Sequence, residues 1–286
     1  MSAHLLAISL GLFSAVTLAA ANMSVKMGDD ILVGRAILSV SAAILILPAA
    51  LFVPAPNAET AAALALTLPF HFFYQLCLVK ALGRGDLSLV FPVMRGAAPL
   101  LTAFTAMLLL REHLAPLAWV GLLAASAAVI AFALPPKGVR LRDHPDRSAL
   151  AWAAATAVGV SLYNATDARG VRLAPDPFTF IVWLFLLDWI LITAAALLFR
   201  RHALASAVAM KWRYGVAAGA LSIFSFGAAL YAFSLMETAK VSALRETSVV
   251  FAALMGSLFL GESFGRRRLV AALALAAGLV LMQFGD

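Results

Sequence analysis

One predicted helix carries several polar side chains on a single face, deep within an apolar segment. His71, Tyr74, Gln75 and Leu78 follow one another at spacings of three and four residues, so a helix over residues 60–80 places them on one side. An imidazole, a phenol and an amide can donate and accept hydrogen bonds. This face is predicted to line a substrate site. The alternative is a hydrogen-bonding seam between helices.

A second predicted helix, 149–168, adds further polar candidates. Tyr163 and Asn164 lie well inside it and are candidates for contacts with the same substrate. Asp167 lies on the same face but only one residue before the predicted end, so water is expected to reach it.

Aromatic rings mark a third predicted helix, 214–236. Phe224 and Tyr231 lie on the face that corresponds to the His71 face, and such rings suit an apolar substrate side chain. Gly227 and Ala228, which lie between them, are predicted to serve helix packing instead.

Charged residues inside apolar segments are costly and usually face a cavity or a partner. Arg95, Arg245 and Glu246 are such residues. A buried cation can bind a substrate carboxylate, or it can brace the bundle by pairing with a glutamate or a helix C-terminal carbonyl. The bracing role is favoured because the two arginines are related by the repeat described below.

Asp188 is a lone carboxylate in the middle of predicted helix 177–199, and Arg35 is a lone cation near the start of another. Asp188 can carry a coupling proton if it is buried, or it can hydrogen-bond a neighbouring helix, and both readings stay open. Glu112 and Glu262 lie at helix ends and are predicted to cap neighbouring helices.

Known catalytic motifs are missing, so an enzyme is not predicted. The sequence Gly83-Arg84-Gly85-Asp86 matches a protease motif, but its aspartate lies in a connector and no partner aspartate is placed for it. No zinc-protease, serine-hydrolase or Walker motif occurs. The single cysteine, Cys77, excludes an internal disulfide. Neither a metal nor a cofactor is therefore predicted.

The composition shows what must position these residues. The chain has 286 residues, of which 64% are hydrophobic and 12% charged, whereas a soluble domain has about 45–50% and about 25%. An all-α, polytopic membrane protein is predicted, because a span needs about 20 apolar residues. Ten spans are expected, over residues 3–22, 33–53, 60–80, 87–110, 115–134, 149–168, 177–199, 214–236, 241–260 and 266–284.

The spans form an internal repeat. Shifting the sequence by 150 positions aligns residues 93–134 with 243–284, so that Arg95 meets Arg245 and Glu112 meets Glu262. We expect a first five-helix repeat over residues 1–134, a basic linker over 135–148 and a second repeat over 149–286. Because five is odd, the second repeat enters the membrane from the opposite side. Such inverted repeats are typical of secondary transporters with alternating access.

Two segments carry a family resemblance. Asp86-Leu-Ser-Leu-Val-Phe-Pro-Val-Met-Arg95 through Arg111-Glu112, and Ala239-Lys-Val-Ser-Ala-Leu-Arg245 through Gly261-Glu262, resemble the ten-helix EamA-type exporters of the drug/metabolite transporter superfamily. Within this superfamily the chain is similar to YddG-like exporters of aromatic amino acids. Arg111 departs from the family pattern, which has glycine before the glutamate. The resemblance implies export of neutral or aromatic amino acids, or similar metabolites; a drug or cation exporter and a non-transporting protein are the alternatives.

The net charge of +7 concerns orientation in the membrane, and no nucleic-acid partner is predicted. Fourteen of the 21 Lys and Arg residues lie in the connectors opposite the termini and only four in those on the terminus side. The basic connectors are therefore expected in the cytoplasm and the termini outside, although the resemblance favours cytoplasmic termini. The predicted setting is a bacterial inner membrane, with a monomer that binds a small-molecule substrate within the lipid bilayer.

Overall fold

The computed structural model of the chain describes residues 2–25, 30–84, 87–133, 147–260 and 266–283. Every regular element in these ranges is a helix, as the composition predicted. The predicted linker lies almost wholly outside the described residues, as does Glu262. The helices are α1 (Ala3–Val25), α2 (Ile31–Ile46), η1 (Leu47–Leu51, a 3-10 turn), α3 (Ala58–Leu82), α4 (Leu87–Leu110), α5 (Pro116–Ala133), α6 (Arg147–Leu173), α7 (Pro177–Phe233), α8 (Thr238–Arg245), α9 (Ser248–Leu260) and α10 (Arg266–Gln283).

Helix α3, which carries the predicted polar face, has well-defined ends. The side chain of Asn57 accepts a hydrogen bond from the Thr60 N–H at 2.8 Å, which satisfies one free donor of the first turn. Glu59 lies in that first turn and Lys80 in the last, and both charges complement the helix dipole. Pro69 lies inside the helix, two residues before His71.

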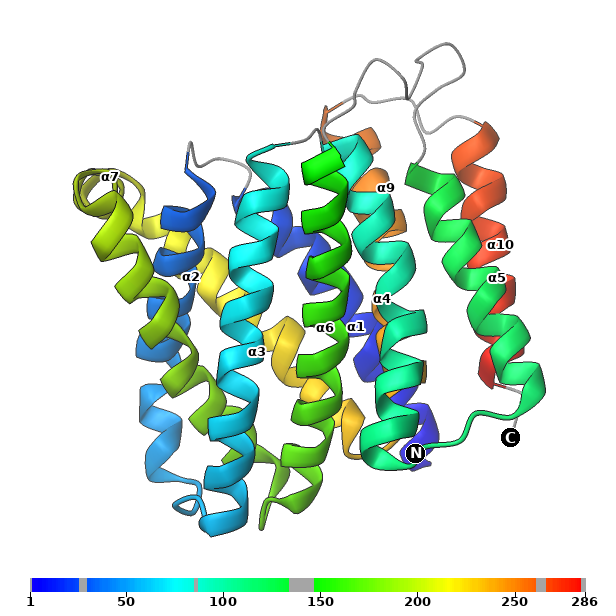
Figure 1. Cartoon of the computed structure of the whole chain (residues 1–286), viewed down its shortest axis with the longest axis horizontal. Coiled ribbons are helices and arrows are strands. Elements are labelled where there is room, and N and C mark those ends of the chain that lie inside the picture. Colours follow the sequence, from blue (N-terminus) through cyan, green and yellow to red (C-terminus); the bar gives the residue numbers. More distant parts are fainter. Residues whose placement is uncertain (1, 26–29, 85–86, 134–146, 261–265, 284–286) are drawn as a thin grey trace.

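Helix α7 contains both the seventh and the eighth predicted spans. Its 57 residues would extend about 86 Å if straight, far more than a bilayer core of about 30 Å. The helix is interrupted at Arg200, where φ is −143° and ψ is 31°. Figure 1 shows the chain turning back there, and the segments Pro177–Val208 and Trp212–Phe233 are each long and apolar enough to span.

The ninth predicted span is not one helix. Residues 241–260 were expected to be continuous, but α8 ends at Arg245 and α9 begins at Ser248. Glu246 lies in the break, and its N–H still donates to the carbonyl of Ala243 at 3.0 Å. Discontinuous helices of this kind occur at transporter sites, where unpaired backbone groups and charges meet inside the membrane.

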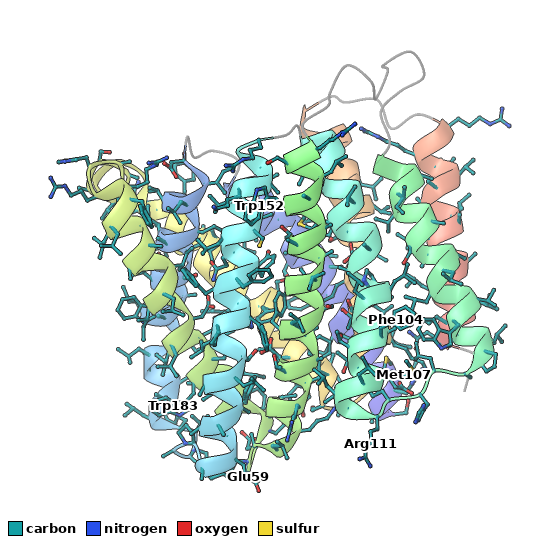
Figure 2. The ribbon with its side chains drawn as sticks, viewed as in Figure 1. Glu59, Phe104, Met107, Arg111, Trp152 and Trp183 are labelled. Carbon is teal, nitrogen blue, oxygen red and sulfur yellow. The ribbon has the colours of Figure 1, made fainter. Side chains whose placement is uncertain are left out.

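Six helical segments of the described residues are long and apolar enough to cross a membrane, and α5 and α10 are shorter apolar helices. The helices stand side by side, and α1 begins at the same end of the bundle at which α10 finishes (Figure 1). Figure 2 shows Glu59 and Arg111 at that end too, whereas Trp152 lies near the other. Large apolar side chains such as Leu108 and Leu198 are exposed on the outside, which suits contact with lipid.

Helices from the two parts of the chain pack on one another reciprocally. Helix α6 packs against α3 and α4, while α1 packs against α7, α8 and α9. Helix α5 packs against α10, where a Cβ added to Gly121 would approach the Gly278 carbonyl oxygen to 2.5 Å. The first helix of each predicted repeat therefore contacts the third and fourth spans of the other, an arrangement that two inverted repeats would produce.

Candidate functional site

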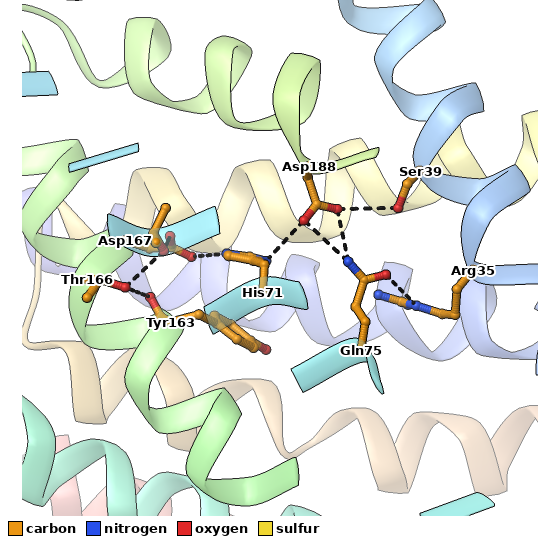
Figure 3. A network of polar contacts seen from close by, with 9 residues as sticks. Arg35, Ser39, His71, Gln75, Tyr163, Thr166, Asp167 and Asp188 are labelled. Carbon is orange, nitrogen blue, oxygen red and sulfur yellow. Dashed lines mark hydrogen bonds and ion pairs between the residues drawn. The ribbon is translucent and has the colours of Figure 1, made fainter. Parts of the chain in front are cut away.

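A chain of polar contacts joins α2, α3, α6 and α7 (Figure 3). Helix α3 supplies His71 and Gln75, whose side chains are both buried. Helices α6 and α7 each supply an aspartate, and α2 supplies an arginine and a serine. The predicted face of α3 is therefore the meeting point of the two parts of the chain.

His71 lies between the two aspartates. Its Nε2 atom is 2.9 Å from Oδ2 of Asp167, and its Nδ1 atom is 3.6 Å from Oδ1 of Asp188. The hydroxyl of Thr67 donates to Asp167 Oδ1 at 2.6 Å and lies 2.9 Å from the hydroxyl of Thr166. Each aspartate thus has histidine and neutral donors around it.

Asp188 also contacts the first part of the chain. It accepts hydrogen bonds from Ser39 Oγ at 3.3 Å and from Gln75 Nε2 at 3.3 Å. The Arg35 Nε–H in turn donates to Gln75 Oε1 at 3.2 Å. Of the two interpretations of Asp188, hydrogen bonding to neighbouring helices is present in the structure, and proton coupling stays a proposal.

The expectation that water reaches Asp167 is wrong, because α6 continues to Leu173 rather than ending at residue 168. Six residues of helix at about 1.5 Å each place Asp167 about 9 Å from that end. Its exposed fraction is 0%. This aspartate, set aside in the sequence, is a central group of the site.

Aromatic rings pack beside the imidazole. The Tyr163 ring stacks on His71 with centroids 4.5 Å apart, and Tyr74 approaches Tyr163 edge-on at 5.1 Å. Phe226 of α7 lies 5.5 Å from His71 and 5.8 Å from Tyr163. Phe185, also of α7, lies 6.3 Å from Phe226. Tyr74 and Tyr163 are thus both near His71, as the sequence suggested.

Phe224, the first aromatic candidate of α7, was placed on the wrong face. Phe224 is 58% exposed and has no part in the described ring contacts. Tyr231 stacks on Phe178 at 5.2 Å instead. Positions i and i+2 of a helix point in directions about 200° apart around its axis, so Phe226 faces His71 while Phe224 faces outward. Leu78, the last member of the α3 face, is buried.

A second charged group lies at the α8–α9 break. Nη1 of Arg95 is 3.2 Å from Oε1 of Glu246, and both side chains are largely buried. The guanidinium of Arg245 lies 5.1 Å above the Phe226 ring, which links this group to the aromatic cluster. The buried Nε of Arg245 and Oε2 of Glu246 make no hydrogen bond within the described residues. The predicted pairing with a glutamate is thus present for Arg95.

Asn164 joins three helices. Its Nδ2 donates to Thr102 Oγ1 of α4 at 3.2 Å and to Ser242 Oγ of α8 at 3.3 Å. Its Oδ1 is buried and has no partner within the described residues. The amide nitrogen is therefore occupied by the protein, and only the carbonyl oxygen remains for a substrate.

Glu112 forms a further cluster at the terminus end of the bundle. Its carboxylate accepts hydrogen bonds from the N–H of Thr238 at 2.9 Å and from the hydroxyl of the same residue at 2.8 Å. Arg172 donates to it at 2.6 Å and also to the carbonyls of Phe233 and Met236. The predicted capping role of Glu112 is confirmed, and the capped helix is α8. Arg111 before it takes a φ of 57°, so the tight turn forms without glycine.

Residues 147–284, from α6 to α10, match the model of the EamA-like transporter family. The second part of the chain is thus similar to the EamA-like transporters. This match suggests a membrane transporter of small molecules, and the apolar helices of the described residues indicate a multi-pass integral membrane protein. The resemblance to the drug/metabolite transporters is thereby supported at the level of the EamA-like family.

The fold extends beyond the matched residues. A solved crystal structure is similar to this chain over 98% of its length and over 95% of that chain, with a TM-score of 0.77 and 17% sequence identity. At that identity the likeness shows the fold alone. A search of curated proteins found no match. No group of three or more His, Cys, Asp or Glu able to hold a metal occurs among the described residues.

Proposed function

We propose that the protein is a secondary transporter that exports amino acids, chiefly neutral and aromatic ones, by alternating access. The observation that carries this proposal is the composition of the central site. Carboxylates, guanidiniums and aromatic rings lie together there, buried between the two parts of the chain. A zwitterion with an apolar side chain has the complementary groups.

The ammonium group of an amino acid fits the Asp188 end of the site. The side chain of Asp188 is 19% exposed, so it is the more accessible of the two aspartates. No Lys or Arg lies within ion-pair distance of it among the described residues, and its partners other than His71 are neutral. A substrate ammonium would therefore supply the positively charged partner that neither Lys nor Arg provides for Asp188 among the described residues.

The substrate carboxylate fits Arg245. This guanidinium is buried and its Nε has no hydrogen-bond acceptor among the described residues. It also lies over Phe226, whose ring packs on Tyr163 and His71. A substrate held there would rest its side chain against these rings, and ring contacts of this kind tolerate several apolar shapes, which suits broad specificity.

Alternating access is supported by the clusters at two levels of the bundle. Glu112, Arg172 and Thr238 bind α4, α6 and α8 together at the terminus end. The break at Glu246 divides the following span at the level of the charged site. To open a route from the centre to the terminus end, the contacts of Glu112 with Arg172 and Thr238 would have to break. The interruption between α8 and α9 would then serve as the hinge at which α8 changes its direction.

Exchange in proteoliposomes tests the function. Vesicles preloaded with unlabelled L-phenylalanine should take up labelled L-phenylalanine faster than empty or protein-free vesicles. Arg245→Gln should raise the half-saturating concentration for phenylalanine but leave that for phenethylamine, which lacks the carboxylate, little changed. Uptake no faster than in protein-free vesicles, for every neutral amino acid offered, would refute amino-acid transport.

A cation exporter of the same fold is the second candidate. It is favoured by Asp167 and Asp188, two carboxylates that flank a histidine and contact no Lys or Arg at ion-pair distance within the described residues. In that case phenethylamine or tetraphenylphosphonium should exchange well and phenylalanine should not. Competition between labelled phenylalanine and each cation separates the two functions.

We further propose that the protein acts as a monomer in a bacterial inner membrane, with two inverted repeats over residues 1–134 and 149–286. Exposed basic residues such as Arg200 and Arg201 lie at the end opposite the termini, which favours that end in the cytoplasm. Alkaline phosphatase fused to the C-terminus should be active if the termini are periplasmic. An inactive fusion that is active as a cytoplasmic reporter would reverse the orientation.

A further inference from the structure

His71 has a carboxylate at each of its two ring nitrogens. A neutral imidazole carries one N–H and can donate to one acceptor, whereas an imidazolium donates from both nitrogens. The Nε2–Asp167 contact at 2.9 Å is a hydrogen bond, and the Nδ1–Asp188 contact at 3.6 Å is longer than one. Nε2 is therefore paired with Asp167, and Asp188 is the acceptor placed for a second proton, on Nδ1.

We propose that His71 binds the proton that drives transport, and that Asp188 is shared in turn by this proton and by the ammonium group of the substrate. The proposal rests on the proposed function and adds its energy source. It makes the protein a proton antiporter with one proton exchanged for each substrate molecule. The proton is taken from water on one side, held at Nδ1 of His71, and released to water on the other.

The two aspartates have different roles in this exchange. Asp167 is fully buried and also accepts the hydroxyl hydrogen bond of Thr67 at 2.6 Å, so it fixes the ring with its proton on Nε2. Asp188 is partly exposed and is held by the neutral donors Ser39 and Gln75 at 3.3 Å. Asp188 therefore keeps its position when His71 is neutral, and it is the group that a substrate cation can reach.

The affinity of His71 for a proton depends on the charged groups of all the helices packed around it. Three charges act on the imidazole, those of Asp167 on α6, Asp188 on α7 and Arg35 on α2. Arg35 reaches it through Gln75, to which it donates a hydrogen bond. Tyr163 of α6 contributes a ring stacked on His71. The guanidiniums of Arg95 on α4 and Arg245 on α8 act on Tyr163 rather than on the imidazole. Phe226 lies between His71 and Arg245.

The charge balance explains why proton and substrate should alternate. With His71 protonated, the three groups His71, Asp167 and Asp188 carry a net charge of −1. With His71 neutral they carry −2, and two carboxylates face each other across an uncharged ring. A substrate ammonium at Asp188 restores −1, so either cation satisfies the site, and both together are not needed.

The same contacts connect occupancy to conformation. His71 belongs to the first part of the chain, and both aspartates belong to the second. A cation at this position therefore attracts the two parts to each other, and its absence removes that attraction. Passage through the closed arrangement should need one cation, either the proton or the substrate, which is the condition for strict exchange.

The test uses the complete protein in proteoliposomes with the membrane potential clamped at zero. Exchange of labelled for unlabelled L-phenylalanine without a pH gradient first tests the proposed function alone. Vesicles with a lumen one pH unit more acidic than the medium should then accumulate phenylalanine about tenfold, the limit for one proton per substrate. Rapid exchange with no accumulation would overturn the proton site while the transport function stands.

Two variants make the test specific to His71. His71→Gln keeps an amide donor for Asp167 but cannot bind a proton, so accumulation should fall to onefold whatever exchange rate remains. His202→Gln makes the same substitution at an exposed histidine of α7 and should keep tenfold accumulation. Tenfold accumulation by His71→Gln would overturn the proposal.

A direct measurement covers the case in which His71→Gln does not transport. Carbon-13 spectra of histidine-labelled protein in nanodiscs, compared with those of His71→Gln or of a folded His71→Phe, identify the His71 signal. This signal should titrate between pH 5 and 9, and saturating phenylalanine should shift its midpoint to lower pH. A signal that does not change over this range, or a midpoint that phenylalanine leaves unchanged, would overturn the proposal.

Discussion

The buried ion pair between Arg95 and Glu246 allows a sharp test of what these charges do. Glu246→Gln removes the carboxylate charge that Arg95, whose side chain is 17% exposed, meets at 3.2 Å. It also removes the negative charge that acts on Arg245, so two guanidiniums remain together in the centre of the bundle. Arg95→Gln, by contrast, leaves Glu246 beside Arg245. Glu246→Gln should therefore be the more damaging change.

The size of the effect follows from burial. Removing one partner of a buried pair typically costs about 3–5 kcal/mol, because the other charge is left uncompensated. Arg95→Gln should lower the free energy of unfolding by about 3 kcal/mol or less. The carboxyl that loses its partner can take up a proton, whereas a guanidinium cannot lose one. At about 2–3 °C per kcal/mol for a large domain, Glu246→Gln should lower Tm by about 6–15 °C.

The assay is thermal unfolding in detergent, followed by tryptophan fluorescence at fixed detergent and pH. Arg200→Gln is the matched control, because Arg200 pairs with Asp30 at 3.0 Å but the two side chains are 57% and 30% exposed. An exposed pair contributes about 0–1 kcal/mol, so this control should change Tm by at most about 3 °C. The double variant Arg95→Gln, Glu246→Gln has two neutral amides that can bond each other, and it should recover at least half of the loss.

Two results would refute this reasoning. If Glu246→Gln lowers Tm no more than Arg200→Gln, the pair does not stabilise the fold. If the double variant loses as much stability as the two single variants added together, the two residues do not act on each other. In the first case a role for these charges in binding the substrate carboxylate becomes the better explanation.

Three further predictions concern the packing and the site. Glu112→Ala removes the cap of α8 and the contact with Arg172, and it should cost about 2–4 kcal/mol in detergent unfolding, against less than 1 for the exposed Glu59→Ala. Gly121→Ala should cost at least about 1–3 kcal/mol, since its Cβ would meet α10 backbone at 2.5 Å, whereas Gly227→Ala, with 3.7 Å to a side chain, should be tolerated. In exchange assays Phe226→Ala should reduce phenylalanine transport, and Phe224→Ala should not.

Periodicity and apolar length were sufficient to predict most of the fold. The apolar segments located the helices, because the length that a bilayer requires leaves few alternatives. The split between α8 and α9 was not predictable. No proline or glycine marks Glu246 and Thr247, so local sequence gives no sign that the helix breaks there. The break lies where tertiary charge contacts replace the local pattern.

The site was predicted well on α3 and less well elsewhere. His71, Tyr74 and Gln75 belong to a helix whose centre was unambiguous, so their common face could be read from spacing alone. Asp167 was misjudged because its depth depends on where α6 ends, and helix ends are the least certain feature of a sequence prediction. The face of α7 was misjudged because aligning two repeats locates a helix to within a residue or two, and an error of two residues turns the face by about 200°.

The repeat itself shows where the two parts of the chain have become different. A shift of 150 positions places Glu246 opposite Gly96, although the arginines beside them are equivalent. A Cβ on Gly96 would come within 2.4 Å of Ile130, so α4 needs the glycine to pack, whereas the second part carries a carboxylate and breaks its helix.

Under the proposed alternating access, exchanging the two conformations would bring Arg245 to the position that Arg95 occupies here, but position 96 has no carboxylate to meet it. The ion pair then exists in one conformation only and stabilises that conformation over the other. Glu246→Gln should therefore change the rates of the two half-cycles unequally, which separate measurements of efflux and uptake can resolve.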